Sequence, residues 1–218
     1  MRPCRACYAL ASGMKHAIRN TATLVVVMTL LLAGGLAFGQ SDDEEVFVPT
    51  YTLGDQTLSI NLGLFVPLFF ALGPDGVAPA NLSLGAAGSL AWSSYLSNSW
   101  TLGLDIGGAF ALTPNRRTLF MVPITARGSY VIQAYPWEFP ISLGLGMNFS
   151  RLDDMLKVDP VVKLGGSVLW NHSSQWAFGA NLVYWFVPQI YSASSPAGSD
   201  ATRLGNFLEV SLSALYHF

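Results

Sequence analysis

The sequence predicts an all-β protein: an eight-stranded antiparallel up-and-down transmembrane β-barrel that begins at residue 57. Three observations predict it: a low content of charge, an alternation of apolar with small polar residues, and an N-terminal export segment. Only 11% of the 218 residues are charged and 51% are hydrophobic, with a mean hydropathy of +0.42. Soluble domains usually carry about 25% charged residues. A spanning helix needs roughly 20 apolar residues, and the one uninterrupted run near that length is 21–38.

Residues 1–39 have the pattern of a secretory signal peptide. A basic region precedes an apolar stretch, 24–32, and small residues follow it: Arg2, Arg5, Lys15 and Arg19, then Gly34, Gly35, Ala37 and Gly39. This order is typical of a cleaved export signal, and we expect cleavage between Gly39 and Gln40. Two alternatives stay open: an uncleaved inner-membrane anchor, and a start at Met14. Cys4 and Cys7 precede the cleavage point, so we expect no disulfide in the exported chain.

Residues 40–56 are expected to form a short acidic periplasmic N-terminal tail. Four consecutive acids occupy 42–45, and the exported chain keeps seven bases and 13 acids, a net charge of −6. A run of like charges is usually solvated, so we expect the tail to be solvated and mobile. No basic residues cluster as nucleic-acid binding would require.

Residues 57–218 repeat one theme, an alternating segment followed by a turn. In the first segment Leu58, Ile60 and Leu62 share one face, while Ser59, Asn61 and Gly63 share the other. An alternation with period two indicates strand rather than helix. The segments are 58–68, 82–93, 100–110, 120–133, 141–149, 162–170, 175–186 and 208–218. Eight strands suit a closed barrel with an interior wide enough for side chains, and closure removes the edges that lipid would not tolerate.

The composition of the polar face indicates whether the apolar face of the barrel wall points inward or outward. A lipocalin-like soluble barrel, with its apolar side chains inside, is the serious alternative. The polar face consists of Ser, Gly, Ala, Thr and Asn, with four charges: Asp105, Arg127, Lys163 and Glu209. A water-facing exterior would carry charges at about 25–35% of its positions. We therefore expect the bulky apolar side chains to face lipid.

The connections and the aromatic residues predict the orientation. Connections 95–99, 135–139 and 171–174 are short and are expected in the periplasm, whereas 70–80, 112–117, 152–160 and 189–203 are expected outside the cell. Transmembrane barrels have this asymmetry, and aromatic girdles at both interfaces. The expected lower girdle is Trp92, Trp100, Trp137, Trp170, Trp176 and Tyr216, and the upper one is Phe69, Phe110, Phe120, Phe149 and Phe186.

The last segment ends in Tyr216 and Phe218, with apolar residues alternating before them. This end resembles the terminal strand of bacterial outer-membrane barrels, and the resemblance implies recognition of Phe218 and Tyr216 by the barrel-assembly machinery. With the signal and the eight strands, residues 57–218 resemble the OmpA transmembrane domain, OmpX and OmpW. No motif separates these families. Length, apolar loops and low interior charge favour OmpW, a resemblance that implies passage of small hydrophobic molecules.

The four charges are expected to form a polar network in the lumen. Asp105 with Arg127, and Lys163 with Glu209, could pair, because an unpaired charge in a low-dielectric interior costs several kcal/mol. The network is either a structural plug or a polar constriction that gates solutes. Small side chains line the rest of the interior. Either a few large residues fill the space, namely Phe65, Met121, Trp185 and Phe207, or a cavity remains. We expect a partial cavity.

Pro123 lies several residues inside a predicted strand. Proline has no ladder donor and is usually confined to bulges or strand ends. It could open a lateral exit into lipid, as a hydrophobic-solute channel would need. Pro67 and Pro188, by contrast, are expected to end strands.

We expect no catalysis, cofactor or metal site. A hydrolytic barrel needs a base near the outer rim, and the exported chain has only His172 and His217, both expected at the periplasmic end. Asp153, Asp154 and Asp159 could bind a divalent cation weakly, but a solvated loop tip explains them better.

Two functional hypotheses follow for an outer-membrane protein. The first is a narrow channel or carrier for small, apolar solutes. The second is a non-conducting structural or surface-exposed barrel whose outer loops bind host or envelope partners. The outer loops hold five bases and five acids, so their charge favours no particular partner.

Overall fold

The computed structural model describes residues 50–72, 76–114, 117–152, 155–189 and 203–218. The expected signal peptide and residues 40–49 of the expected tail lie outside these ranges. No helix among the described residues is long and apolar enough to cross a membrane.

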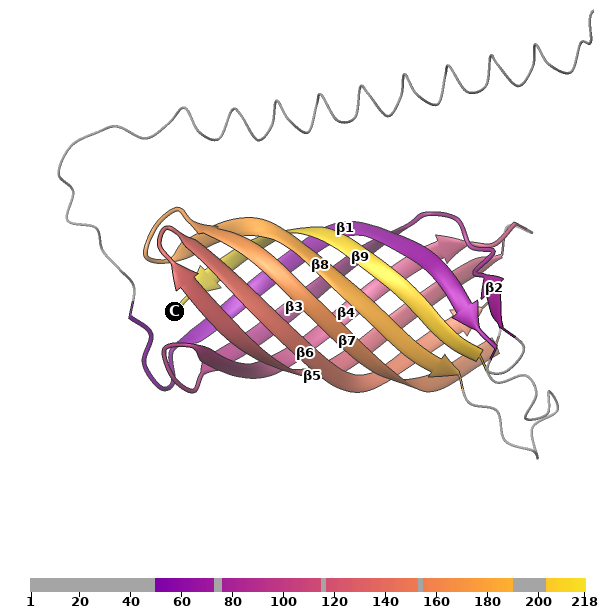
Figure 1. Cartoon of the computed structure of the whole chain (residues 1–218), viewed down its shortest axis with the longest axis horizontal. Helices are drawn as coiled ribbons and strands as arrows, with labels where there is room; N and C mark the ends of the chain where they lie inside the picture. Colours follow the sequence, from indigo (N-terminus) through magenta and orange to yellow (C-terminus); the bar gives the residue numbers. More distant parts are fainter. Residues whose placement is uncertain (1–49, 73–75, 115–116, 153–154, 190–202) are drawn as a thin grey trace, which may run out of the picture. The chain divides into compact units, whose positions relative to one another are not determined.

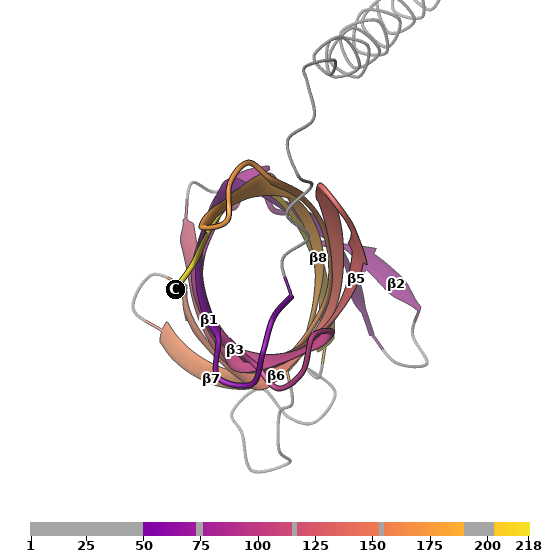
Figure 2. The ribbon, with the colours of Figure 1, turned by 90° about the vertical axis from the view of Figure 1, so that its left-hand side faces the viewer.

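The described chain is a closed antiparallel barrel of eight strands with one short additional strand, which confirms the predicted fold class (Figure 1). The strands are β1 (Gln56–Ala71), β2 (Val77–Pro79), β3 (Gly85–Tyr95), β4 (Trp100–Leu112), β5 (Thr118–Ala134), β6 (Trp137–Leu152), β7 (Met155–Asn171), β8 (Trp176–Gln189) and β9 (Arg203–His217). From β3 onward each strand pairs with the next, and β1 pairs with both β3 and β9. The ring of strands is seen end-on in Figure 2.

Two ends of the barrel can be distinguished by their connections. We call the end with the tight connections 96–99, 135–136 and 172–175 the turn end, and the opposite end, where β2 lies, the loop end. The expected first outer loop contains β2, which pairs with the end of β1 through Phe69↔Pro79 and Ala71↔Val77. The expected third outer loop, 152–160, is mostly strand, because β6 runs to Leu152 and β7 starts at Met155.

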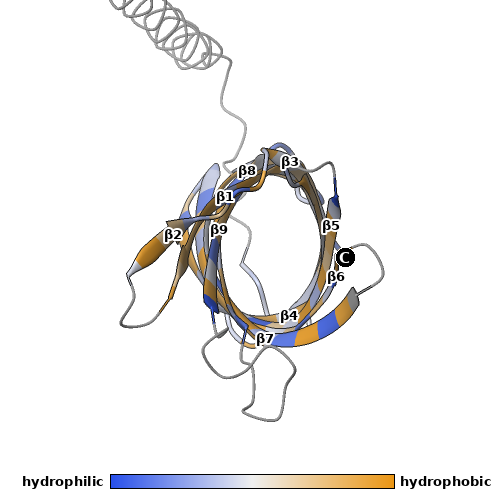
Figure 3. Cartoon of the chain, turned by 90° about the vertical axis from the view of Figure 1, so that its right-hand side faces the viewer, coloured by the Kyte–Doolittle hydropathy of each residue, from blue (hydrophilic) through white to orange (hydrophobic). Residues whose placement is uncertain are grey.

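The alternation sorts side chains between the two faces of the wall as predicted, and hydrophilic and hydrophobic residues follow one another along the ribbon of β7 in Figure 3. Leu62 on β1 is 67% exposed and its register partner Leu212 on β9 is 73% exposed. The neighbouring inward positions Ser59, Asn61 and Ser211 are buried. The apolar side chains therefore cover the outside of the barrel, and the small polar ones line the lumen.

Inward side chains form successive layers along the lumen. On β1, which runs from the turn end to the loop end, the inward series Thr57, Ser59 and Asn61 is polar, and Phe65 is apolar. The half of the lumen toward the turn end is therefore polar, and the half toward the loop end is apolar. The glycines of the wall let strands approach closely: a Cβ on Gly146 would lie 1.9 Å from the carbonyl oxygen of Ile124 on β5.

Candidate functional site: the barrel interior

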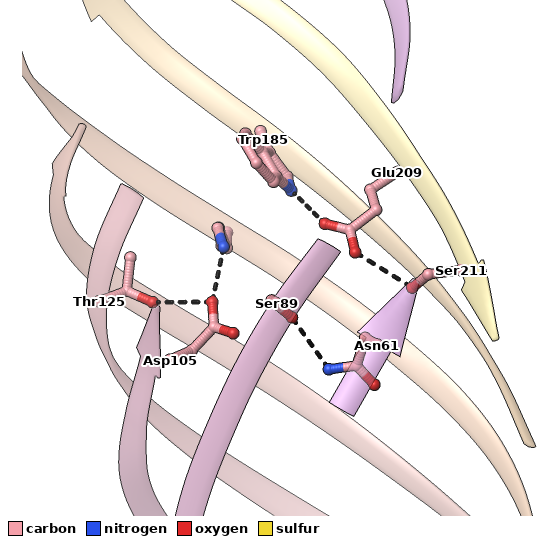
Figure 4. Close-up of polar contacts among 8 residues, drawn as sticks. Asn61, Ser89, Asp105, Thr125, Trp185, Glu209 and Ser211 are labelled. Carbon is pink, nitrogen blue, oxygen red and sulfur yellow. Dashed lines mark hydrogen bonds and ion pairs between the residues drawn. The ribbon is translucent and has the colours of Figure 1, made fainter. Parts of the chain in front are cut away.

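The four predicted lumen charges surround one small cavity of about 30 Å³ near the middle of the barrel. Asp105 comes from β4, Arg127 from β5, Lys163 from β7 and Glu209 from β9. Lys163 Nζ donates to Asp105 Oδ2 at 2.6 Å, and both side chains are only 7% exposed. Thr125 Oγ1 donates to the same Asp105 oxygen at 3.4 Å (Figure 4).

The ion pair of Asp105 is formed with Lys163 rather than with Arg127. Asp105 is in register with Thr125, whereas Arg127 is in register with Gly103, one inward position closer to the turn end. Lys163 instead reaches Asp105 from β7, three strands along the wall. The Nε of Arg127 has no hydrogen-bond partner and is buried, and the side chain lines both lumen cavities.

The hydrogen bonds to Glu209 come from residues other than Lys163. Glu209 accepts hydrogen bonds from Trp185 Nε1 and Ser211 Oγ, each at 3.1 Å. Lys163 Nζ lies 4.4 Å from the centre of the Trp185 ring, an arrangement in which the ring attracts the ammonium group. Trp185 therefore links the charged layer to the apolar layer beyond it.

A chain of side-chain hydrogen bonds connects three strands on the turn-end side of the charged layer. Asn181 on β8 donates to Asn61 Oδ1 at 2.9 Å, and Asn61 Nδ2 donates to Ser89 Oγ on β3 at 2.9 Å. Toward the turn end lies a polar chamber of about 50 Å³, whose walls include Ser59, Ser129 and Ser213. A cavity of this size holds water-sized guests, not a drug-sized solute.

A cluster of large side chains closes the lumen toward the loop end. Phe65, Trp185 and Phe207 are at most 1% exposed, with ring centres 5.4 Å apart for Phe65–Trp185 and 5.0 Å apart for Phe65–Phe207. Met121 belongs to the same cluster. Large residues therefore fill the half of the lumen toward the loop end, and the expected partial cavity is reduced to the two small spaces in the half toward the turn end.

Beyond the aromatic cluster the loop end holds an open, largely apolar basin of about 900 Å³. Its apolar walls include Phe70, Leu82, Leu119 and Leu152, and its polar members are Asn81, Thr113, Gln189 and Arg203. The basin and the polar chamber are separated by the aromatic cluster and the charged layer.

Pro123 lies where the β4–β5 ladder is interrupted. Register pairs run to Ile106↔Ile124 and resume at Ala109↔Met121. A Cβ on Gly107 would lie 3.0 Å from Pro123 Cγ, and Pro123 is fully buried. The proline ring therefore packs against Gly107 at this interruption.

The turn end contains two residues that the sequence analysis did not single out, Tyr51 and Glu138. Tyr51 was assigned to a solvated tail, but it is only 8% exposed. Glu138 was assigned to a turn, but it is the second residue of β6, points inward and is 3% exposed. The alternation of Trp137, Glu138 and Phe139, with both aromatics exposed, was the signal that could have identified Glu138.

The two histidines and the chain end also lie at the turn end. His172 follows β7 and its ring lies 5.2 Å from that of Trp170, and buried His217 ends β9. Phe218 N donates to Gln56 O at 3.0 Å, which extends the seam between β1 and β9, and the Tyr216 ring lies 4.9 Å from Trp176 in the expected lower girdle.

The acids considered for metal binding are placed only in part. Asp153 and Asp154 lie outside the described residues. Asp159 is not at a solvated loop tip, because it is 2% exposed within β7 and pairs with Lys157 at 2.9 Å. In the described ranges, no three His, Cys, Asp or Glu side chains come together as metal ligands.

The fold and its packed interior define the class of small, eight-stranded outer-membrane-type barrels. The structure is similar to Neisserial surface protein A (NspA), with a TM-score of 0.57 and 10% identity over 75% of this chain and 97% of that one. It is also similar to the outer membrane protein OprG from Pseudomonas aeruginosa, with a TM-score of 0.52 and 10% identity over 78% and 98%. At these identities the likeness concerns the fold.

One protein-family model matches residues 39–216, and the chain belongs to that family. An uncharacterized protein of Borreliella burgdorferi is 22% identical in an alignment of 181 positions that covers 73% of this chain and 81% of the relative. An uncharacterized protein of Treponema pallidum is 24% identical over 136 residues, 62% of this chain and 60% of the relative.

Proposed function

We propose that the protein is an exported, integral outer-membrane barrel with a sealed lumen, which acts as a structural or surface-exposed protein rather than as a through-pore or an enzyme. The likeness of fold and the apolar exterior support a membrane location. Leucines more than half exposed, such as Leu62, Leu104 and Leu212, recur around the wall, and apolar patches larger than a few hundred Å² are rare on soluble monomers.

The packed lumen is the observation that carries the sealed-barrel proposal. Between the turn end and the basin, a solute would have to pass the Lys163–Asp105 pair and then the Phe65–Trp185–Phe207 cluster. The cavities on the way have volumes of about 50 and 30 Å³. Moving the ion pair apart would leave two buried charges uncompensated, which costs several kcal/mol.

Ion flux through purified protein in liposomes tests the proposal. The unaltered protein should release trapped ions no faster than protein-free liposomes, whereas Trp185→Gly combined with Phe207→Gly should increase release, because both side chains lie in the aromatic cluster. Insertion of each protein is checked by its resistance to protease. Release by the unaltered protein clearly faster than from protein-free liposomes would contradict a sealed lumen.

A second candidate function, a carrier for small hydrophobic solutes, is favoured by one observation, the apolar basin at the loop end. In this alternative a solute would enter the basin, displace side chains of the aromatic cluster, and leave sideways into lipid at the ladder interruption beside Pro123. Pro123→Ala should then slow uptake of an apolar tracer by cells, while Pro188→Ala, near the end of β8, should not. Equal uptake by the two variants and the unaltered protein would count against the carrier.

A further inference from the structure

The segment ahead of β1 enters the turn-end mouth of the barrel. In Figure 2 the indigo chain that leads into β1 curves across the ring. Its Tyr51 ring is stacked between two rings of the wall, at 4.2 Å and 15° from Tyr95 of β3 and at 5.0 Å and 9° from His217 of β9. One side chain therefore bridges two strands that do not pair with each other.

The phenol group of Tyr51 is anchored to a buried carboxylate. Tyr51 Oη donates to Glu138 Oε1 at 2.9 Å, and Asn171 Nδ2 donates to the same oxygen at 2.9 Å. Burial raises the pKa of Tyr51 well above its ordinary range, so the hydroxyl keeps its proton. A carboxylate that is 3% exposed needs donors in place of water, and Tyr51 is one of the two that Glu138 has, beside Asn171.

The backbone turns at this point to direct the ring inward. Tyr51 N donates to Asn98 Oδ1 at 2.9 Å, and Thr52 N donates to Asp55 Oδ2 at 2.7 Å. Gly54 has φ +99°, a conformation that favours glycine, and its N–H donates to Tyr95 O at 3.0 Å. Residues 50–53 belong to no strand, and the Tyr51 side chain and the bond from Tyr51 N to Asn98 connect them to the barrel.

The polar chamber lies directly behind this ring. Tyr95 and Glu138, which contact Tyr51, are also chamber walls. The far side of the chamber is bounded by Arg127 and Asn181, and beyond these lie the charged layer and the aromatic cluster. The chamber is therefore closed off toward the loop end, and at the turn end Tyr51 packs against two of its wall residues without lining the chamber itself.

We propose that residues 50–53 act as a stopper, with Tyr51 as its latch, that reversibly closes the polar chamber at the turn end. Withdrawal of Tyr51 admits water and small ions to the chamber and hydrates Glu138, while the aromatic cluster keeps the loop end shut. This proposal does not depend on the proposal that the lumen is sealed along its whole length, because it concerns only the opening at the turn end.

Cysteine labelling tests the stopper directly, because the only natural cysteines are Cys4 and Cys7, and both can be replaced by serine. Ser129→Cys places a thiol in the chamber wall, and Ala109→Cys places one in the aromatic cluster. A small charged methanethiosulfonate is applied to the full chain in detergent. Tyr51→Ala should accelerate labelling at position 129 at least tenfold and leave position 109 protected.

Tyr51→Phe separates the two parts of the latch. It keeps the ring between Tyr95 and His217 but removes the donor to Glu138, so labelling at position 129 should increase less than in Tyr51→Ala. Unchanged labelling at position 129 in Tyr51→Ala would overturn the proposal. Equal acceleration at positions 129 and 109 would overturn it too, because Tyr51 would then stabilise the whole barrel rather than close one mouth.

Discussion

The buried pair of Lys163 and Asp105 gives the sharpest quantitative prediction. Its atoms lie 2.6 Å apart, and each side chain is 7% exposed. Removing one partner of a buried ion pair costs about 3–5 kcal/mol, because the other charge stays buried without compensation. Lys163→Met also loses the contact with the Trp185 ring, an attraction of up to about 2 kcal/mol when desolvated. Lys163→Met should therefore destabilise the barrel at least as much as Asp105→Asn.

The test is a double-mutant cycle on the free energy of unfolding, measured by urea titration of protein folded in lipid vesicles. Lys163→Met and Asp105→Asn should be non-additive by about 2–3 kcal/mol, as for residues in direct contact. Arg127→Met and Asp105→Asn should couple by about 0.5–1 kcal/mol, because Arg127 lies one inward position away. A larger coupling for Asp105 with Arg127 than with Lys163 would refute the assignment.

Three further predictions concern the wall and the chain end. Leu62→Arg, on the outward face of β1, should destabilise the membrane-embedded barrel by about 2–4 kcal/mol, whereas Leu53→Arg, exposed ahead of β1, should have little effect on the same urea titration. Gly146→Ala should cost about 1–3 kcal/mol because its Cβ would meet the β5 backbone, and Gly166→Ala, with open space around it, should be close to neutral. Phe218→Ala should lower the amount of barrel in the outer membrane of cells several-fold. The urea midpoint of the refolded protein should stay nearly unchanged, since Phe218 is 60% exposed. Equal losses in both assays would argue against an assembly signal.

The barrel itself could be predicted from the sequence because period-two alternation is a local property. The faces on which Leu62 and Asn61 lie can be predicted from the few residues around them, without knowledge of the rest of the chain. The short strand β2 was missed because Val77–Pro79 is too brief to alternate. The sequence does not predict the start of β7, because Pro160 suggests a loop. In the structure Pro160 lies in the part of β7 that pairs only with β6, and the β7–β8 pairs begin after it, at Val162.

The contacts inside the lumen could not be predicted in the same way. Which charges meet depends on the stagger of the strands around the closed ring, and a shift of one inward position separates Arg127 from Asp105. Tyr51 escaped prediction for a related reason. Its partners Tyr95, Glu138 and His217 are 44, 87 and 166 residues away in sequence, and the acidic run before it indicated a solvated tail.

The direction in which the leucines point is the central claim, and spin labelling of consecutive positions on β4 tests it most directly. Single cysteines at positions 101–106 are labelled in protein reconstituted into lipid vesicles, and collision with oxygen, which concentrates in lipid, is measured at each. Labels at Leu102, Leu104 and Ile106 should collide often with oxygen, and labels at Thr101, Gly103 and Asp105 rarely. The opposite phase, or no alternation, would contradict a barrel with its apolar face in lipid.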